Sequence, residues 1–140
     1  MNLMEWSRCE KEFIRKVTPD EEKIRSIKEV AESRLRFVKT AEPTKENVSF
    51  IIEGYYEIIK ELLSALMLKD GLKSKNHQCL ITHFYRKNPD YEFEANLISQ
   101  LSYLRNRLNY YGEAIDISFY NKNKEEIEKL IGILKERLEY

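Results

Sequence analysis

The side chains best suited to binding an anionic ligand lie close together near residue 108. Two guanidiniums, two side-chain amides and two phenols occur in one short stretch: Arg105, Asn106, Arg107, Asn109, Tyr110 and Tyr111. Arginine binds phosphate and carboxylate groups through parallel, charge-assisted hydrogen bonds. The stretch therefore predicts an anionic ligand, RNA or a nucleotide, and its candidate binding residues are Arg105, Asn106, Asn109, Tyr110 and Tyr111.

The segment that carries this cluster has the spacing of an amphipathic helix. Its apolar residues recur every three or four positions: Leu97, Leu101, Leu104, Leu108 and Tyr111. A helix turns by about 100° per residue, so Arg105 lies roughly 80° from the middle of the apolar stripe, and Asn109 shares its side. A groove or an interface would lie along such an edge. The alternative is that the arginines only pair with glutamates of a neighbouring element.

A second basic region runs from residue 69 to residue 87. It contains Lys69, Lys73, Lys75, Arg86 and Lys87, with Asp70 as the only acid. The region could contact a phosphate backbone, or it could be a solvated surface. Its histidines, His77 and His83, are six residues apart, which does not fit a helical metal pair. We expect no metal and no cofactor, and a capping or surface role for each histidine.

The nine tyrosines offer rings that could stack on bases. For Tyr55 and Tyr56 we expect a structural role instead, with the ring at the core edge and the hydroxyl at a polar partner. Tyr111 stays open between the two roles. The sequence has no phosphate-cradling glycine loop, no nucleophile elbow and no HExxH metal pair.

Composition predicts one globular domain over residues 1–140. The 24 Lys and Arg balance the 24 Asp and Glu, so anion binding must come from a local patch rather than from a global positive field. Cys9 and Cys79 are too few for a disulfide framework, and we expect them to be reduced, at least partly buried thiols. Neither a membrane-spanning segment nor a signal peptide is recognisable, so a cytoplasmic location is expected.

Apolar spacing predicts six helical segments and no strands, which favours an all-α bundle. The first helix is expected over residues 3–17, and the second after a capping box of Thr18 and Glu21. The third, residues 45–69, has the wide apolar face of a central helix and ends at Gly71. A shorter helix should run from a Ser74 cap to residue 87. The cluster helix should end or kink at Gly112, residues 113–121 are ambiguous, and the last helix should span residues 123–140.

Three stretches resemble the HEPN domain, a small helical family linked to RNA cleavage and to minimal nucleotidyltransferases. Residues 54–63, GYYEIIKELL, are similar to its aromatic-led central helix. Residues 68–77, LKDGLKSKNH, are similar to its turn of leucine, glycine, serine and histidine. Arg105-Asn106 resembles the start of its RNxxxH-like motif. Over about residues 45–112, the resemblance implies a HEPN-like, up-and-down bundle of four to five helices that forms homodimers.

The histidine of that motif is missing. In catalytic HEPN ribonucleases the motif arginine suits the phosphate, and the histidine suits proton transfer or orientation of the 2′-hydroxyl. Here positions 110–112 read Tyr110, Tyr111 and Gly112. A phenol with a pKa of about 10 is a poor base at pH 7, unlike an imidazole with a pKa near 6.5. The departure argues against a working ribonuclease and leaves only Arg105 and Tyr110 as catalytic candidates.

The resemblance also implies a protein partner. Some HEPN proteins pair with a minimal nucleotidyltransferase as toxin and antitoxin, and a tyrosine near the motif receives adenylyl groups. The matching position here is Gly112, so modification would have to fall on Tyr110 or Tyr111. The leading interpretation is a homodimeric HEPN-like protein that binds RNA or a nucleotide phosphate. The alternatives are an active metal-independent endoribonuclease and a non-catalytic helical scaffold for protein interaction.

Overall fold

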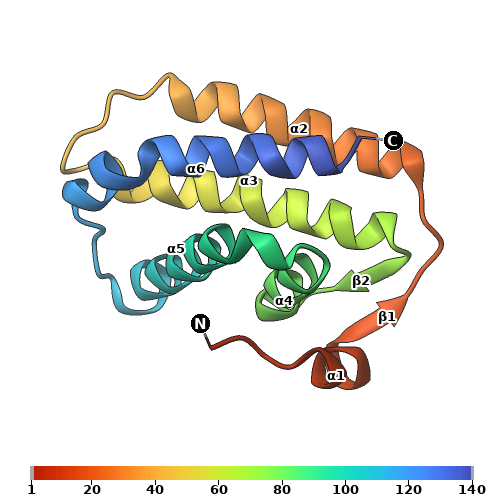
Figure 1. Cartoon of the computed structure of the whole chain (residues 1–140). Coiled ribbons are helices and arrows are strands. Elements are labelled where there is room, and N and C mark those ends of the chain that lie inside the picture. Colours follow the sequence, from red (N-terminus) through yellow and green to blue (C-terminus); the bar gives the residue numbers. More distant parts are fainter. Residues whose placement is uncertain (1, 140) are drawn as a thin grey trace.

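The structure is a computed structural model that describes residues 2–139, and it is mainly helical (Figure 1). Its α-helices are α1 Trp6–Arg8, α2 Glu21–Lys39, α3 Val48–Lys69, α4 His77–Lys87, α5 Glu92–Tyr111 and α6 Ile117–Arg137. A π-helical turn, Cys9–Phe13, a 3-10 turn, Pro89–Tyr91, and two short strands, β1 Ile14–Lys16 and β2 Leu72–Ser74, complete the described elements. The all-α class is confirmed, but the prediction that the chain has no strands is wrong.

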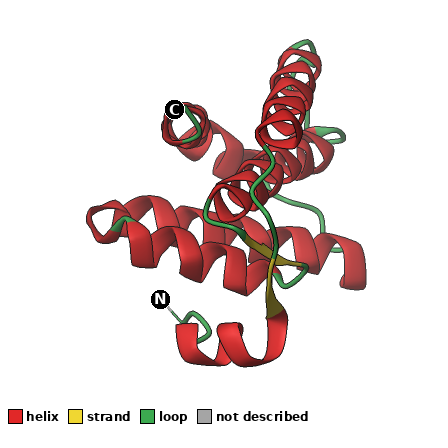
Figure 2. Ribbon diagram, turned by 90° about the vertical axis from the view of Figure 1, so that its right-hand side faces the viewer, coloured by secondary structure: helices red, strands yellow, loops and turns green. Residues whose placement is uncertain are grey.

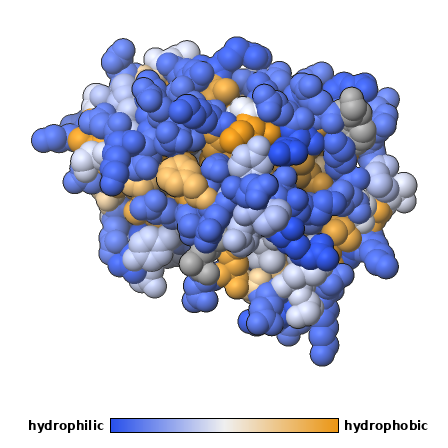
Figure 3. Space-filling model, in the orientation of Figure 1, coloured by the Kyte–Doolittle hydropathy of each residue, from blue (hydrophilic) through white to orange (hydrophobic). Residues whose placement is uncertain are grey.

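Helix α3 is the central helix, as its wide apolar face predicts. It packs against α2, α4, α5 and α6, and thirteen of its residues are buried. The long helices α2, α3, α5 and α6 alternate in direction along the chain, while α4 is seen nearly along its axis (Figure 1). Most of the surface in Figure 3 is hydrophilic, and its apolar side chains appear as separate patches. The core is therefore built around α3, which brings α4 and α5 together on one side of it.

The N-terminal segment is not the helix expected over residues 3–17. It makes one helical turn and one π-helical turn and then enters β1, which pairs antiparallel with β2 (Figure 2). Long-range contacts hold it in this form. A disulfide joins Cys9 to Cys79 of α4, and the Thr82 hydroxyl donates to the carbonyl of Met4 at 2.8 Å. These tertiary contacts outweigh the local helical spacing of the apolar residues.

The disulfide corrects the expectation of reduced thiols. Cys9 and Cys79 are fully buried, as expected, but they are bonded to each other across a separation of 70 residues. Disulfides persist mainly in oxidising compartments. The cysteines therefore give no support to a cytoplasmic location, which stays a prediction. Within residues 2–139, no helix has the length and apolar character needed to cross a membrane.

Two helix starts differ from the expected ones because another residue provides the cap. The side chain of Asp20 accepts from the backbone N–H of Lys23 at 3.1 Å, so α2 does not use a capping box at Thr18. Asn76 caps α4, whereas Ser74 lies in β2. In both cases an Asp or Asn two residues closer to the helix is the better cap.

The remaining boundaries follow the glycines and an acidic cap. Gly71 and Gly112 have φ angles of 74° and 65°, and they terminate α3 and α5 in the left-handed region as expected. Helix α6 begins after Asp116, whose side chain accepts from Ser118 N–H, so most of the ambiguous segment belongs to α6. Tyr140, where the last helix was expected to end, lies outside the described residues.

Candidate anion-binding site

A buried tyrosine links three helices at the edge of the core. The Tyr56 side chain on α3 is 2% exposed, and its hydroxyl lies 3.0 Å from His77 Nδ1 and 3.3 Å from Ser102 Oγ. His77 is the first residue of α4, and Ser102 lies on α5. The structural role expected for Tyr56 is confirmed. The Asn76 cap fixes the start of α4 and therefore holds the His77 imidazole in place.

Arg105 lies three residues after Ser102, and its charge acts on both of these rings. Burial raises the pKa of Tyr56, and the positive charge of Arg105 partly offsets that rise. Burial lowers the pKa of His77 below its usual 6.5, and the charges of Lys60 and Arg105 lower it further. Glu57, which pairs with Lys60, acts in the opposite direction. At pH 7 the site therefore presents a neutral imidazole beside the Arg105 cation and the Lys60–Glu57 ion pair, and an anion placed beside Arg105 would favour the charged form of the imidazole.

Two amides, rather than a carboxylate, hold the Arg105 guanidinium. When the Asn109 amide is oriented so that its nitrogen donates to Glu53 at 2.9 Å, its oxygen accepts from Arg105 Nε at 3.1 Å. Arg105 Nη1 also donates to the Asn106 side-chain oxygen at 3.4 Å. Within residues 2–139, Arg105 has no ion pair with a carboxylate. Its charge is positioned by neutral groups and stays available to an external anion.

Arg107 behaves differently from Arg105. Its guanidinium makes two contacts with the Glu113 carboxylate, one of them from Nε at 2.9 Å, and it lies 4.3 Å from the centre of the Tyr111 ring. The alternative in which a helix arginine pairs with a glutamate therefore applies to Arg107. Arg107 and Arg105 differ in their partners although they are two residues apart on the same helix.

The predicted ligand residues fall into two groups. Arg105, Asn106 and Asn109 are brought together, and the structure adds Tyr56, Ser102 and His77 to them. Tyr110 and Tyr111 are 73% and 68% exposed. On an ideal helix Tyr110 points about 140° away from Arg105. The sequence did not link His77 to the arginine cluster, because the two are joined only by the packing of α4 and α5 against α3.

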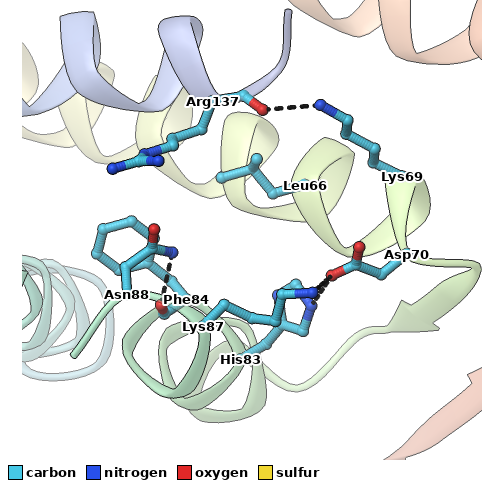
Figure 4. A pocket seen from close by; sticks show the side chains of 8 residues that line it. All are labelled: Leu66, Lys69, Asp70, His83, Phe84, Lys87, Asn88 and Arg137. Carbon is cyan, nitrogen blue, oxygen red and sulfur yellow. Dashed lines mark hydrogen bonds and ion pairs between the residues drawn. The ribbon is translucent and has the colours of Figure 1, made fainter. Parts of the chain in front are cut away.

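The basic region of residues 69–87 is divided by the fold. On one side, Lys69, Lys87 and Arg137 surround a cavity of about 270 Å³ between α3, α4 and the end of α6 (Figure 4). These cations have partners inside the protein. Lys69 donates to the backbone carbonyls of Arg137 and Glu139, and Lys87 lies 3.2 Å from Asp70. This part of the region therefore serves to hold helix ends together.

His83 lies in the wall of the same cavity and is a core histidine rather than a surface group. It is 4% exposed, its Nε2 lies 2.8 Å from Asp70, and its ring is 5.8 Å from that of Trp6. Burial lowers the pKa of His83, and Asp70 partly counteracts this effect. Across the described residues, no group of three or more His, Cys, Asp and Glu is arranged to hold a metal ion.

Comparison of the chain with models of protein families, with curated proteins and with solved structures finds no match. The fold alone defines the class: a mostly helical protein with α3 at its centre.

Proposed function

We propose that this chain is a HEPN-like helical protein that binds RNA, and that Arg105 and His77 flank the bound phosphate. One observation carries the proposal. The Arg105 guanidinium has no carboxylate partner within the described residues, neutral amides hold it, and its charge acts on the pKa of both Tyr56 and His77. Arg107 on the same helix is instead neutralised by Glu113.

The chemistry of the site fits a phosphodiester. The guanidinium offers parallel donors to two phosphate oxygens. Lys60, although it pairs with Glu57 at 2.6 Å, adds a second positive charge near the imidazole. In the tautomer whose Nδ1 accepts from the Tyr56 hydroxyl, His77 Nε2 carries the hydrogen and can donate to a phosphate oxygen or to a ribose hydroxyl. The Asn106 amide can bond to the sugar or to a base edge.

A titration of short single-stranded RNA tests the assignment. Arg105→Ala is expected to weaken binding about tenfold or more, because a hydrogen bond to a charged group contributes about 1.5–3 kcal/mol. The matched control is Arg107→Ala. It removes the same kind of side chain two residues further along α5, where the arginine is paired with Glu113. Equal affinity of the wild type and Arg105→Ala, or an equal loss in both variants, would remove Arg105 from the site.

A second function, metal-independent RNA cleavage, is favoured by His77. The motif histidine expected after Arg105 is absent from α5, but α4 brings an imidazole to the same neighbourhood. When the Tyr56 hydroxyl donates to Ser102 Oγ, the Tyr56 oxygen accepts from His77 Nδ1–H, and Nε2 keeps a free lone pair. The lowered pKa of His77 keeps that nitrogen unprotonated at pH 7. This is the form that a general base requires.

The reaction can be written with these groups. His77 Nε2 accepts the proton of the 2′-hydroxyl, whose oxygen attacks phosphorus and forms a 2′,3′-cyclic phosphate. The bond from phosphorus to the 5′-oxygen breaks, and that oxygen takes a proton from water. The Arg105 guanidinium stabilises the charge on the phosphate oxygens. Incubation of the chain with RNA and a chelator decides between the functions. Cleavage lost in both His77→Ala and Arg105→Ala supports the ribonuclease, and binding without cleavage supports a binding protein.

The proposal includes three further predictions: homodimerisation, pairing with a minimal nucleotidyltransferase, and adenylylation of Tyr110 or Tyr111. Sedimentation of the purified chain measures the first. Co-purification with an adjacent nucleotidyltransferase and the mass of the recovered chain measure the other two. A stable protein partner together with no RNA binding would instead support the scaffold alternative.

A further inference from the structure

The short β-ladder places like charges directly opposite each other. Arg15 of β1 pairs with Lys73 of β2, in the register fixed by Ile14↔Ser74 and Lys16↔Leu72. Directly opposed residues of an antiparallel ladder project on the same face, and like charges there destabilise the pair. Both side chains are exposed. A protein that needed this ladder only for stability would gain from an opposite charge at one of the two positions.

Two more cations join this pair, and no acid neutralises the group. Lys23 of α2 and Arg15, followed by Lys75, lower the pKa of Lys73 through charge repulsion. In the part of the chain that the structure describes, no ion pair is formed by Arg15, Lys23, Lys73 or Lys75. Some exposed cations do have partners, such as Arg8, which lies 2.6 Å from Glu12, and Lys129, which lies 3.7 Å from Glu126. We call Arg15, Lys73 and Lys75 the ladder patch.

The ladder patch borders a hollow that contains an aromatic ring. The hollow measures about 380 Å³, and its lining includes the three cations of the patch, Asn76 and Phe13. Phe13 is 39% exposed, and the Arg8 guanidinium lies over its ring at 5.8 Å from the centre. Glu12, the acid in this lining, already pairs with Arg8. Unpaired cations next to an exposed ring are the combination that binds single-stranded nucleic acid, through phosphates and base stacking respectively.

The patch adjoins the proposed phosphate site along the chain. Lys75 and His77 are two residues apart, so their Cα atoms are separated by about 7 Å at most. Ser74 accepts from Asn76 N–H at 3.1 Å, which shapes the turn that joins β2 to α4. Lys75 and His77 therefore lie at the two ends of one short turn.

We propose that single-stranded RNA held at the Arg105–His77 site continues onto the β1–β2 ladder, where Arg15, Lys73 and Lys75 bind its phosphates and Phe13 stacks on a base. This inference rests on the proposed function and extends it from a single phosphate to a strand of several nucleotides. The inference also predicts that short and long ligands bind differently. A dinucleotide reaches only the Arg105–His77 site, whereas a longer strand also contacts the ladder patch.

The test compares two ligands and two triple variants of the full chain. The ligands are uridine dinucleotide and an oligouridylate of about 12 nucleotides. The patch variant is Arg15→Gln/Lys73→Gln/Lys75→Gln. The control variant, Lys122→Gln/Lys124→Gln/Lys129→Gln, removes three exposed charges from α6. Affinities are measured over a range of salt concentrations, and the helical content and melting temperature of each variant establish that it is folded.

The patch variant is expected to bind the long strand about 100-fold more weakly at about 0.1 M salt, since three lost phosphate contacts lower the salt slope by about 2. Its affinity for the dinucleotide should equal that of the wild type, and the control variant should bind both ligands normally. Equal long-strand affinity of the patch and control variants overturns the inference while the proposed function stands. Stronger binding to vesicles of anionic lipid, lost in the patch variant, also overturns it. If the wild type binds neither RNA, the proposed function falls, and this inference falls with it.

Discussion

Breaking the Cys9–Cys79 bond is expected to lower the free energy of unfolding by about 4 kcal/mol. The disulfide closes a loop with a sequence separation of 70 residues. In the chain-entropy description, such a loop removes about 15 cal/mol/K from the unfolded state, which is about 4 kcal/mol at 25 °C. Total stabilities of single domains are about 5–15 kcal/mol. The reduced chain should therefore be much less stable, and the N-terminal segment should be the first part to detach.

Urea denaturation of the oxidised chain, the reduced chain and Cys9→Ser/Cys79→Ser measures this difference. With a slope of about 2 kcal/mol/M, the midpoint should fall by roughly 2 M in both altered forms. Hydrogen exchange should accelerate most in β1 and in the turns before it, because β2 and the rest of α4 keep their other contacts. Coincident midpoints for the three forms would refute this reasoning. So would two titratable thiols in the untreated, denatured chain, since they would show that the bond does not form.

The remaining predictions concern stability and its dependence on pH. Gly132→Ala should raise the free energy of unfolding by about 1 kcal/mol, because the added Cβ meets nothing within 4 Å and alanine favours the helix. Gly112→Ala should lower it by about 1 kcal/mol, because alanine is strained at a φ of 65°; the opposite order in urea melts would contradict both. Burial lowers the pKa of His83, so the unfolded chain gains a proton before the folded chain does as the pH falls below about 6.5. Stability should therefore decline from about pH 7 to about pH 5, and His83→Gln should flatten that decline. The same pH profile in His83→Gln and the wild type would contradict this role of His83. Tyr56→Phe removes the contacts to His77 and Ser102 and should lower stability by about 1 kcal/mol, whereas a neutral effect in the same melts would show that the hydroxyl adds nothing.

The elements that local chemistry determines were predictable from the sequence. The apolar face of residues 45–69 indicated a central helix, and Gly71 and Gly112 marked the ends of two helices. These features depend on residues a few positions apart. The N-terminal segment was not predictable in this way, because its form depends on β2, Thr82 and a cysteine far along the chain.

The candidate site was predictable only in part, for the same reason. Arg105, Asn106 and Asn109 share one helix, and their proximity follows from helical spacing. His77 joins them through Tyr56, a residue of a third helix, and no local pattern connects His77 with Arg105. The basic region divides into paired and unpaired cations, which depends on where Asp70 and the end of α6 lie in space. The absence of a histidine after Arg105 was correctly seen in the sequence, but the presence of one beside it required the fold.

The most direct test of a phosphate bound between Arg105 and His77 is an NMR titration of the His77 imidazole with and without uridine dinucleotide. A bound phosphate should raise the pKa of His77, because the anion stabilises the imidazolium form. His83, the only other histidine, lies six residues further along α4 near Asp70 and provides an internal reference. We expect the pKa of His77 to rise on binding, that of His83 to stay constant, and the rise to disappear in Arg105→Ala. A dinucleotide that binds without moving the pKa of His77 would contradict the account.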